Sequence, residues 1–176
     1  MTGVDTSHWP QTVLTAAARI ELLVLDVDGV LTDGRLHYDA EGREAKVFHV
    51  RDGLGIKAAM SAGIQIAVIS GRASVPVARR MQELGINEVV LGRDDKLIAL
   101  RELSDRLGLE SLAGVAYVGD DLPDLPAIKA VGLGLTVADG HPEVLAAAMA
   151  ATQRAGGYGA VREICDLLIQ QRQHRA

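Results

Sequence analysis

Residues 20–34 read IELLVLDVDGVLTDG, an apolar run that ends in two aspartates and a glycine turn. The run does not alternate between polar and apolar residues, which is typical of a strand covered on both faces, as in a parallel sheet. Buried strands are predicted over 20–25, 64–69, 88–91, 115–118 and 131–137. Because helical patterns separate these runs, the sequence predicts a Rossmann-like, doubly wound parallel sheet of the α/β class.

The helical patterns and one insertion complete this outline. Helices are predicted over 53–62, 74–84, 94–107, 122–129, 142–149 and 159–171. Residues 35–39 and 44–50 flank a short segment with a glycine, which predicts an inserted β-hairpin over about 35–50. No linker rich in Pro, Gly or Ser divides the chain, so we expect a single domain over 1–176 with no cap domain. We set residues 171–176 apart as a candidate mobile tail.

The composition excludes several functional classes. The net charge of −5 and the few aromatics (one Trp, three Tyr and one Phe) provide neither a basic footprint nor a stacking surface for nucleic acid. The longest uncharged stretch, 58–71, is shorter than the roughly 20 residues that span a bilayer. The only cysteine, Cys165, cannot form an intramolecular disulfide, and the N-terminus has no secretion signal. We therefore expect a cytoplasmic protein without a membrane partner.

Acidic side chains follow two of the predicted strands, where ligands of open α/β sheets bind. Asp26 and Asp28 follow the first strand, and Asp120 and Asp121 follow the strand at 115–118. One carboxylate of the first pair could attack as a nucleophile while the other transfers protons. Like charges this close favour a bound cation, and oxygen ligands favour Mg²⁺. An acidic strand-end turn without a metal is the alternative, because Asp also suits turns.

Two weaker signals lie at the same predicted edge. Ser70 follows the second strand, where its hydroxyl and nearby N–H groups could hold a phosphoryl oxygen, although Ser-Gly also forms ordinary turns. Lys96 lies at the start of a predicted helix, where its charge opposes the helix dipole unless an anion is nearby. A solvated lysine is the alternative there.

The order of these motifs is more specific than any one of them. Over about residues 20–170, the chain resembles the haloacid dehalogenase (HAD) superfamily of phosphatases. The resemblance is carried, in order, by DxDGVLTDG, SGR, a helix-borne lysine and GDDxxD. Within this superfamily, the chain is most similar to the 3-deoxy-D-manno-octulosonate 8-phosphate (KDO 8-phosphate) phosphatases. The segments that carry this resemblance are LDVDGVLTDG, FHVRDGLGIK, SGR, the DK pair at 95–96, AYVGDDLPDLP, VADGHPEV and GGYGAVREICDLL. Members of that family are small, capless and tetrameric.

The resemblance implies a role for each catalytic residue. Asp26 would attack phosphorus to form an aspartyl-phosphate, and Asp28 would protonate the leaving sugar and later activate water. The carboxylates of Asp26 and Asp120, with the backbone carbonyl of Asp28, would bind Mg²⁺. Ser70 and Lys96 would hold the phosphoryl oxygens, a division of labour that suits phosphoryl transfer. Asp121 and Asp124 would support this group.

The resemblance also implies residues that bind the sugar acid: Asp28, His49, Val50, Arg51, Asp52, Gly53, Lys57, Arg72, Arg80 and Lys96. Arginine and lysine suit a substrate with a carboxylate and a phosphate. The choice of Arg80 over Arg79 depends on family spacing alone. His49 replaces a frequent Asn of the family, and Tyr158 replaces a frequent basic residue, which leaves the role of the C-terminal segment open.

The function implied is Mg²⁺-dependent hydrolysis of KDO 8-phosphate in lipopolysaccharide precursor biosynthesis, by a homotetramer. A phosphatase for a related nonulosonate 9-phosphate shares these motifs and is the first alternative. A phospho-acceptor signalling module, also doubly wound, is the second. Such modules place an acidic pair first and the accepting aspartate on a middle strand, whereas here DxD comes first and the acidic pair comes last.

Overall fold

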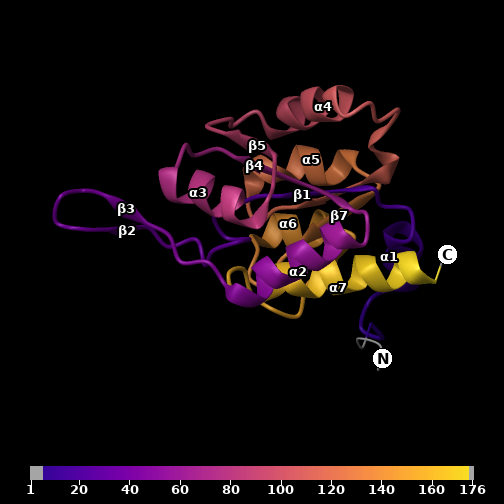
Figure 1. Ribbon diagram of the computed structural model, residues 1–176. Coiled ribbons are helices and arrows are strands. Elements are labelled where there is room, and N and C mark those ends of the chain that lie inside the picture. Colours follow the sequence, from indigo (N-terminus) through magenta and orange to yellow (C-terminus); the bar gives the residue numbers. More distant parts are fainter. Residues whose placement is uncertain (1–5, 175–176) are drawn as a thin grey trace.

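The computed structural model describes residues 6–174, and its centre is a parallel sheet. The strands of this sheet are β1 (Leu22–Leu25), β4 (Gln65–Ser70), β5 (Glu88–Leu91), β6 (Val115–Val118), β7 (Leu133–Thr136) and β8 (Ala150–Ala151). Their order is β5-β4-β1-β6-β7-β8, and each neighbouring pair is parallel (Figure 1). The predicted doubly wound fold is confirmed.

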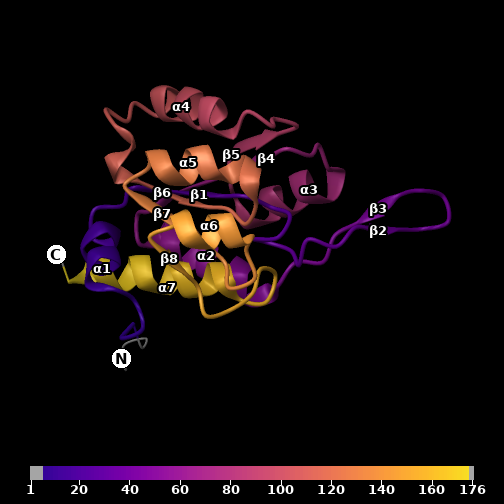
Figure 2. The same cartoon turned by 180° about the vertical axis from the view of Figure 1, so that it is seen from behind.

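Helices cover both faces of the sheet. The helices are α1 (Gln11–Ala17), α2 (Val50–Ser61), α3 (Val75–Leu84), α4 (Lys96–Arg106), α5 (Leu125–Ala130), α6 (Pro142–Ala147) and α7 (Ala160–Gln173), with short 3-10 turns at Leu112–Gly114 and Leu122–Asp124. Successive residues of β1 point to opposite faces. Leu23 and Leu25 therefore pack with α1, α2, α3 and α7, whereas Leu22 and Val24 pack with α4, α5 and α6. Both layers are visible in Figures 1 and 2.

Three elements differ from the sequence prediction. Helix α1 and strand β8 were not predicted, because both are short and their patterns are weak. The strand expected over 44–50 is wrong beyond residue 45, since α2 already begins at Val50. His49 is the N-cap of this helix and accepts a hydrogen bond from the Arg51 backbone N–H at 3.1 Å, so the chain is committed to a helix there.

The inserted hairpin consists of β2 (His37–Tyr38) and β3 (Glu44–Ala45), which form a separate two-stranded antiparallel sheet. It extends away from the body of the protein in both views (Figures 1 and 2). Helix α7 continues through Gln173, so the first part of the predicted tail is helical. Residues 175 and 176 of that tail lie outside the described residues.

Within residues 6–174, no helix combines the length and hydrophobicity that a membrane crossing requires.

Candidate active site

A cavity of about 320 Å³ opens beside the carboxyl ends of β1, β4 and β6. Its lining includes the predicted catalytic residues Asp26, Asp28, Ser70, Lys96 and Asp120, together with Asp121 and Asp124. These residues come from four separate segments of the sequence. The parallel sheet brings them together because all of its strands end at the same edge.

The turn after β1 depends on a glycine that lies against Asp120. The Asp26 backbone N–H donates to the Val118 carbonyl at 2.9 Å, so the pairing of β1 with β6 continues through Asp26. Gly29 then adopts a φ of +88°, and a Cβ at this position would lie 2.0 Å from a carboxylate oxygen of Asp120. A side chain at residue 29 would therefore be strained and would also displace the Asp120 carboxylate.

The ammonium group of Lys96 lies between two buried carboxylates. Its Nζ is 3.1 Å from Asp26 Oδ1 and 2.7 Å from Asp124 Oδ1. Burial alone would lower the pKa of Lys96, but the charges of Asp26 and Asp124 outweigh burial and raise it. Lys96 is therefore a fixed positive charge beside Asp26. Its position at the start of α4 predicted a nearby anion, and the structure provides two, Asp26 and Asp124.

Asp124 is held by three donors. Besides Lys96, the Tyr117 hydroxyl donates to Asp124 Oδ1 at 2.8 Å, and the Asp121 backbone N–H donates to Oδ2 at 3.3 Å. Both Tyr117 and Asp124 are fully buried. With its oxygens engaged in this way, Asp124 serves to hold Lys96 in place.

Three carboxylates at the site, Asp124 among them, form a group that suits a cation. Asp26, Asp120 and Asp124 offer oxygens within 4.8 Å of one another. These three carboxylates and the one ammonium of Lys96 sum to a charge of −2 when all are ionised, which a divalent ion balances. Without a cation, burial and the charge of Asp124 raise the pKa of Asp26 to about 8 and that of Asp120 to about 6. The donor set of oxygens and the excess buried charge therefore fit Mg²⁺.

Ser70 and Arg72 also reach this cavity. Ser70 ends β4 and is buried, and its Oγ accepts a hydrogen bond from the Arg72 backbone N–H at 3.3 Å. The Arg72 side chain turns toward Asp28, with Nε 3.7 Å from Asp28 Oδ2. Arg72 is thus the one arginine of the predicted sugar-binding set that lines the cavity within the described residues.

The other predicted sugar-binding residues lie at the start of α2 and on α3. Arg51 lines a different cavity, and the buried Asp52 carboxylate accepts from the Arg162 backbone N–H at 2.8 Å, where α7 begins. The Arg80 guanidinium lies over the Phe48 ring, 6.0 Å from its centroid. The same region holds His49, Val50, Gly53 and Lys57. The structure does not bring this group into the lining of the strand-end cavity in residues 6–174, so its substrate role stays a prediction.

Comparisons with known proteins agree with this arrangement. A family model for haloacid dehalogenase-like hydrolases matches residues 85–164. The 3-deoxy-D-manno-octulosonate 8-phosphate phosphatase of Salmonella typhi is 48% identical over 157 residues, which cover 89% of this chain and 83% of that protein. The chain belongs to this KDO 8-phosphate phosphatase family.

Solved structures of the phosphatase family superpose closely. The enzyme from Moraxella catarrhalis, crystallised with magnesium, phosphate and KDO, has a TM-score of 0.89 at 45% identity and covers 92% of both chains. The Yersinia pestis enzyme has a TM-score of 0.92 at 42% identity, with 97% of this chain and 92% of that chain covered. A cobalt-bound form from Haemophilus influenzae aligns with a TM-score of 0.86.

Three residues at the site of this phosphatase were not singled out from the sequence. Tyr117 lies in an apolar strand, and its hydroxyl was a signal that could have been used, since a buried tyrosine needs a partner. Lys46 and Glu44, from the hairpin, reach Asp28 and Arg72. No local pattern reveals these two, because their contacts depend on where the base of the hairpin lies relative to the loop after β4.

Proposed function

We propose that this phosphatase hydrolyses KDO 8-phosphate to KDO and inorganic phosphate with Mg²⁺ as its cofactor. The observation that carries the proposal is the buried, negatively charged group of Asp26, Asp120 and Asp124 around Lys96, in one cavity with Asp28. A carboxylate nucleophile, a second carboxyl for proton transfer and fixed positive charge are what phosphomonoester hydrolysis requires.

In the first half of the reaction, a carboxylate oxygen of Asp26 attacks phosphorus while the bond from phosphorus to the sugar oxygen breaks. Asp28 gives its proton to that oxygen, so that the sugar leaves as an alcohol. Lys96, 3.1 Å from Asp26, offsets the negative charge that the phosphoryl group brings to the nucleophile. Ser70 would donate a hydrogen bond to a phosphoryl oxygen.

In the second half, Asp28 is a carboxylate and accepts a proton from water, which attacks the aspartyl-phosphate. The bond between Asp26 and phosphorus breaks, phosphate leaves, and Asp26 returns as a carboxylate. Because Asp28 regains its proton in this step, the cycle closes without another proton donor.

The carboxylates of Asp26 and Asp120 and the backbone carbonyl of Asp28 would hold Mg²⁺, which when bound supplies positive charge that favours the ionised nucleophile and neutralises the phosphoryl group. Without a cation, burial raises the pKa of Asp26 to about 8, so a bound cation would favour the ionised nucleophile near neutral pH.

The experiment that tests this function measures phosphate release from a panel of sugar phosphates with and without Mg²⁺. The panel includes KDO 8-phosphate and a nonulosonate 9-phosphate. We expect preference for KDO 8-phosphate and loss of turnover in EDTA that Mg²⁺ restores. Equal turnover of both ulosonate phosphates would contradict the proposed substrate, and turnover without any divalent ion would contradict the cofactor.

The proposal extends to a homotetramer, which the family resemblance implies, and to the cytoplasm, which the sequence composition predicts. Light scattering on the purified protein tests the assembly. A monomer at working concentration would contradict it.

A further inference from the structure

Four charged side chains meet at the base of the hairpin, next to the catalytic group. Lys46 follows β3, and its ammonium pairs with Asp28 Oδ1 and lies 3.2 Å from Glu44 Oε1. Only 1% of the Lys46 side chain is exposed, which is rare for a lysine and requires partners for its charge. The catalytic scheme above does not use this lysine.

Glu44 connects this lysine to the loop after β4. Its Oε1 accepts from Arg72 Nη2 at 3.1 Å, and its Oε2 accepts from the Ser74 hydroxyl at 2.6 Å. Two cations, Lys46 and Arg72, and two carboxyl groups, Asp28 and Glu44, therefore form a cluster that has no net charge when all four side chains are ionised. While Asp28 is a carboxylate, Lys46 can hold it without leaving an unpaired positive charge beside it.

The same cluster attaches the hairpin to the body of the protein. Tyr38 of β2 is the cross-strand partner of Glu44 in β3. Both contact Arg72, since Arg72 Nη2 also donates to the Tyr38 hydroxyl at 3.1 Å. Strands β2 and β3 form a sheet of their own, so no strand pairing joins them to the central sheet. Side-chain contacts at the base of the hairpin therefore hold Lys46 next to Asp28.

The two oxygens of Asp28 have different surroundings. Oδ1 accepts from Lys46, whereas Oδ2 faces Arg72 Nε at 3.7 Å, which is beyond hydrogen-bond distance. We propose that Lys46, held by Glu44, is a positioning residue that anchors Asp28 through Oδ1 and presents Oδ2 to the leaving oxygen of the substrate. The proposal rests on the function above, in which Asp28 is the proton donor. The base of the hairpin would then support catalysis in the active site of its own chain.

The test compares two substrates that differ in their need for a proton donor. The sugar of KDO 8-phosphate and the glycerol of glycerol 3-phosphate leave as alkoxides unless the leaving oxygen is protonated. The leaving group of p-nitrophenyl phosphate is nitrophenolate, which is stable without a proton. The parameter kcat/KM covers only the steps up to departure of the alcohol, so it isolates the first proton transfer. A residue that acts through Asp28 must affect the alkyl phosphates far more than the aryl phosphate.

We expect Lys46→Met to lower kcat/KM for the alkyl phosphates by about tenfold or more, a share of the 10²–10⁴-fold that general acid catalysis provides. For p-nitrophenyl phosphate the loss should stay below about threefold, because no proton is needed. The matched control is Lys129→Met on α5, an exposed lysine that should leave both values unchanged. Equal losses on both substrates would overturn the proposal, since they would indicate a role in binding or folding.

Two further measurements keep the test decisive. Glu44→Gln keeps the shape of the side chain and should show the same substrate bias, which also covers the case in which Lys46→Met fails to fold. Adding Lys46→Met to Asp28→Asn should cost little more than Asp28→Asn alone, because both changes remove one function. Full additivity would contradict positioning through Asp28.

Failure of the proposed function has a different signature. If the wild-type protein hydrolyses p-nitrophenyl phosphate and glycerol 3-phosphate but not KDO 8-phosphate, the substrate is wrong, and the bias between the first two still tests Lys46.

Discussion

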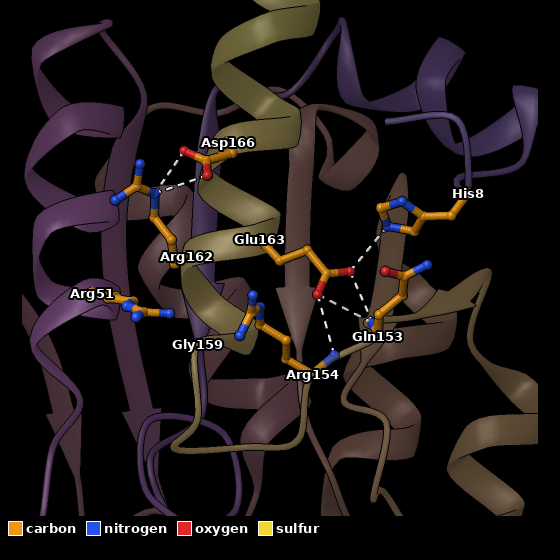
Figure 3. A pocket seen from close by; sticks show the side chains of 8 residues that line it. All are labelled: His8, Arg51, Gln153, Arg154, Gly159, Arg162, Glu163 and Asp166. Atoms are coloured by element: carbon orange, nitrogen blue, oxygen red, sulfur yellow. Dashed lines mark hydrogen bonds and ion pairs between the residues drawn. The ribbon is translucent and has the colours of Figure 1, made fainter. Parts of the chain in front are cut away.

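Two cavities of similar size differ in whether the ionisable groups that line them are buried without enough opposite charge. The strand-end cavity measures about 320 Å³, and a second one, between the starts of α2 and α7, measures about 380 Å³. Both are lined by ionisable side chains. Figure 3 shows the second, whose ionisable lining residues are His8, Arg51, Arg154, Arg162, Glu163 and Asp166.

Both carboxylates of the second cavity are paired with neighbouring residues. Glu163 accepts from His8 at 3.1 Å and from the backbone N–H groups of Gln153 at 2.9 Å and Arg154 at 3.2 Å (Figure 3). Arg162 Nε donates to Asp166 at 2.8 Å, a pair that spans one helical turn. These contacts tie the N-terminal segment and the loop after β8 to α7, which is a structural task.

The strand-end cavity keeps charge that its own residues do not balance. Carboxylates outnumber the ammonium of Lys96 there, and burial holds the pKa of Asp26 at about 8. Volume therefore does not locate the chemistry, since the larger cavity carries only one net positive charge, three arginines against two carboxylates, and Arg51 and Arg154 are exposed to water. Buried, unbalanced charge does locate it, because it can persist only where a ligand completes it.

The largest effect that would test this contrast comes from Asp26→Asn. Removing the nucleophile should lower kcat/KM for KDO 8-phosphate by roughly 10⁴-fold or more, since covalent attack is lost. Asp166→Asn, in the second cavity, is the matched control and should keep wild-type rates. Phosphate release by the two variants is the measurement. Comparable losses in both would erase the distinction between the cavities.

Lys96→Met should have the next largest effect. It removes the charge between Asp26 and Asp124, and we expect a loss of about 10²–10³-fold in kcat, the range measured when a preorganised electrostatic donor is removed. It also leaves Asp124 as an unpaired buried carboxylate, so stability should fall by about 3–5 kcal/mol. Urea unfolding measures this change. An active, fully stable variant would show that the Lys96 contacts do not matter.

The raised pKa values predict how Mg²⁺ binding varies with pH. Without a cation, the folded pKa values are about 8 for Asp26 and about 6 for Asp120, above the ordinary 3.8 of each. The contribution of these carboxyls to stability is thus full below pH 3.8 and is lost as the pH rises through 6 to 8.

Since Mg²⁺ binds the ionised forms, the gain in melting temperature on adding Mg²⁺ should be larger at about pH 8.5 than at about pH 5.5. Differential scanning fluorimetry at both pH values measures this gain, and Asp120→Asn should reduce it. A gain that is larger in acid would contradict the assignment of these carboxylates.

The smallest effect is expected in the second cavity. Glu163→Gln weakens the acceptor that His8, Gln153 and Arg154 share, and we expect a loss of about 1–3 kcal/mol in the free energy of unfolding. Phosphatase rates should not change below the melting transition. A selective loss of activity in the folded variant would mean that this cavity takes part in function.

Much of the strand-end site could be predicted from sequence because it follows from one rule. Asp26, Asp28, Ser70 and Asp120 each lie at or just after the end of an apolar strand, and parallel strands end at a common edge. Lys96 needed the resemblance, since a lysine at the start of a helix has no required partner. The contacts of Lys46 and Glu44 could not be predicted, because the short strands of the hairpin have no periodic pattern that indicates which groups their side chains contact.

The α/β class, most strands of the sheet and the acidic residues at their ends follow from apolar runs and turns, which are local features of the chain. Which charged groups lie together, and how deeply they are buried, depends on the folded arrangement. Three sets of contacts join residues far apart in the chain: Lys96 with Asp26 and Asp124, Tyr117 with Asp124, and Lys46 with Asp28. Burial then sets their energetics, because the cost of a charge depends on its surroundings rather than on its neighbours in sequence.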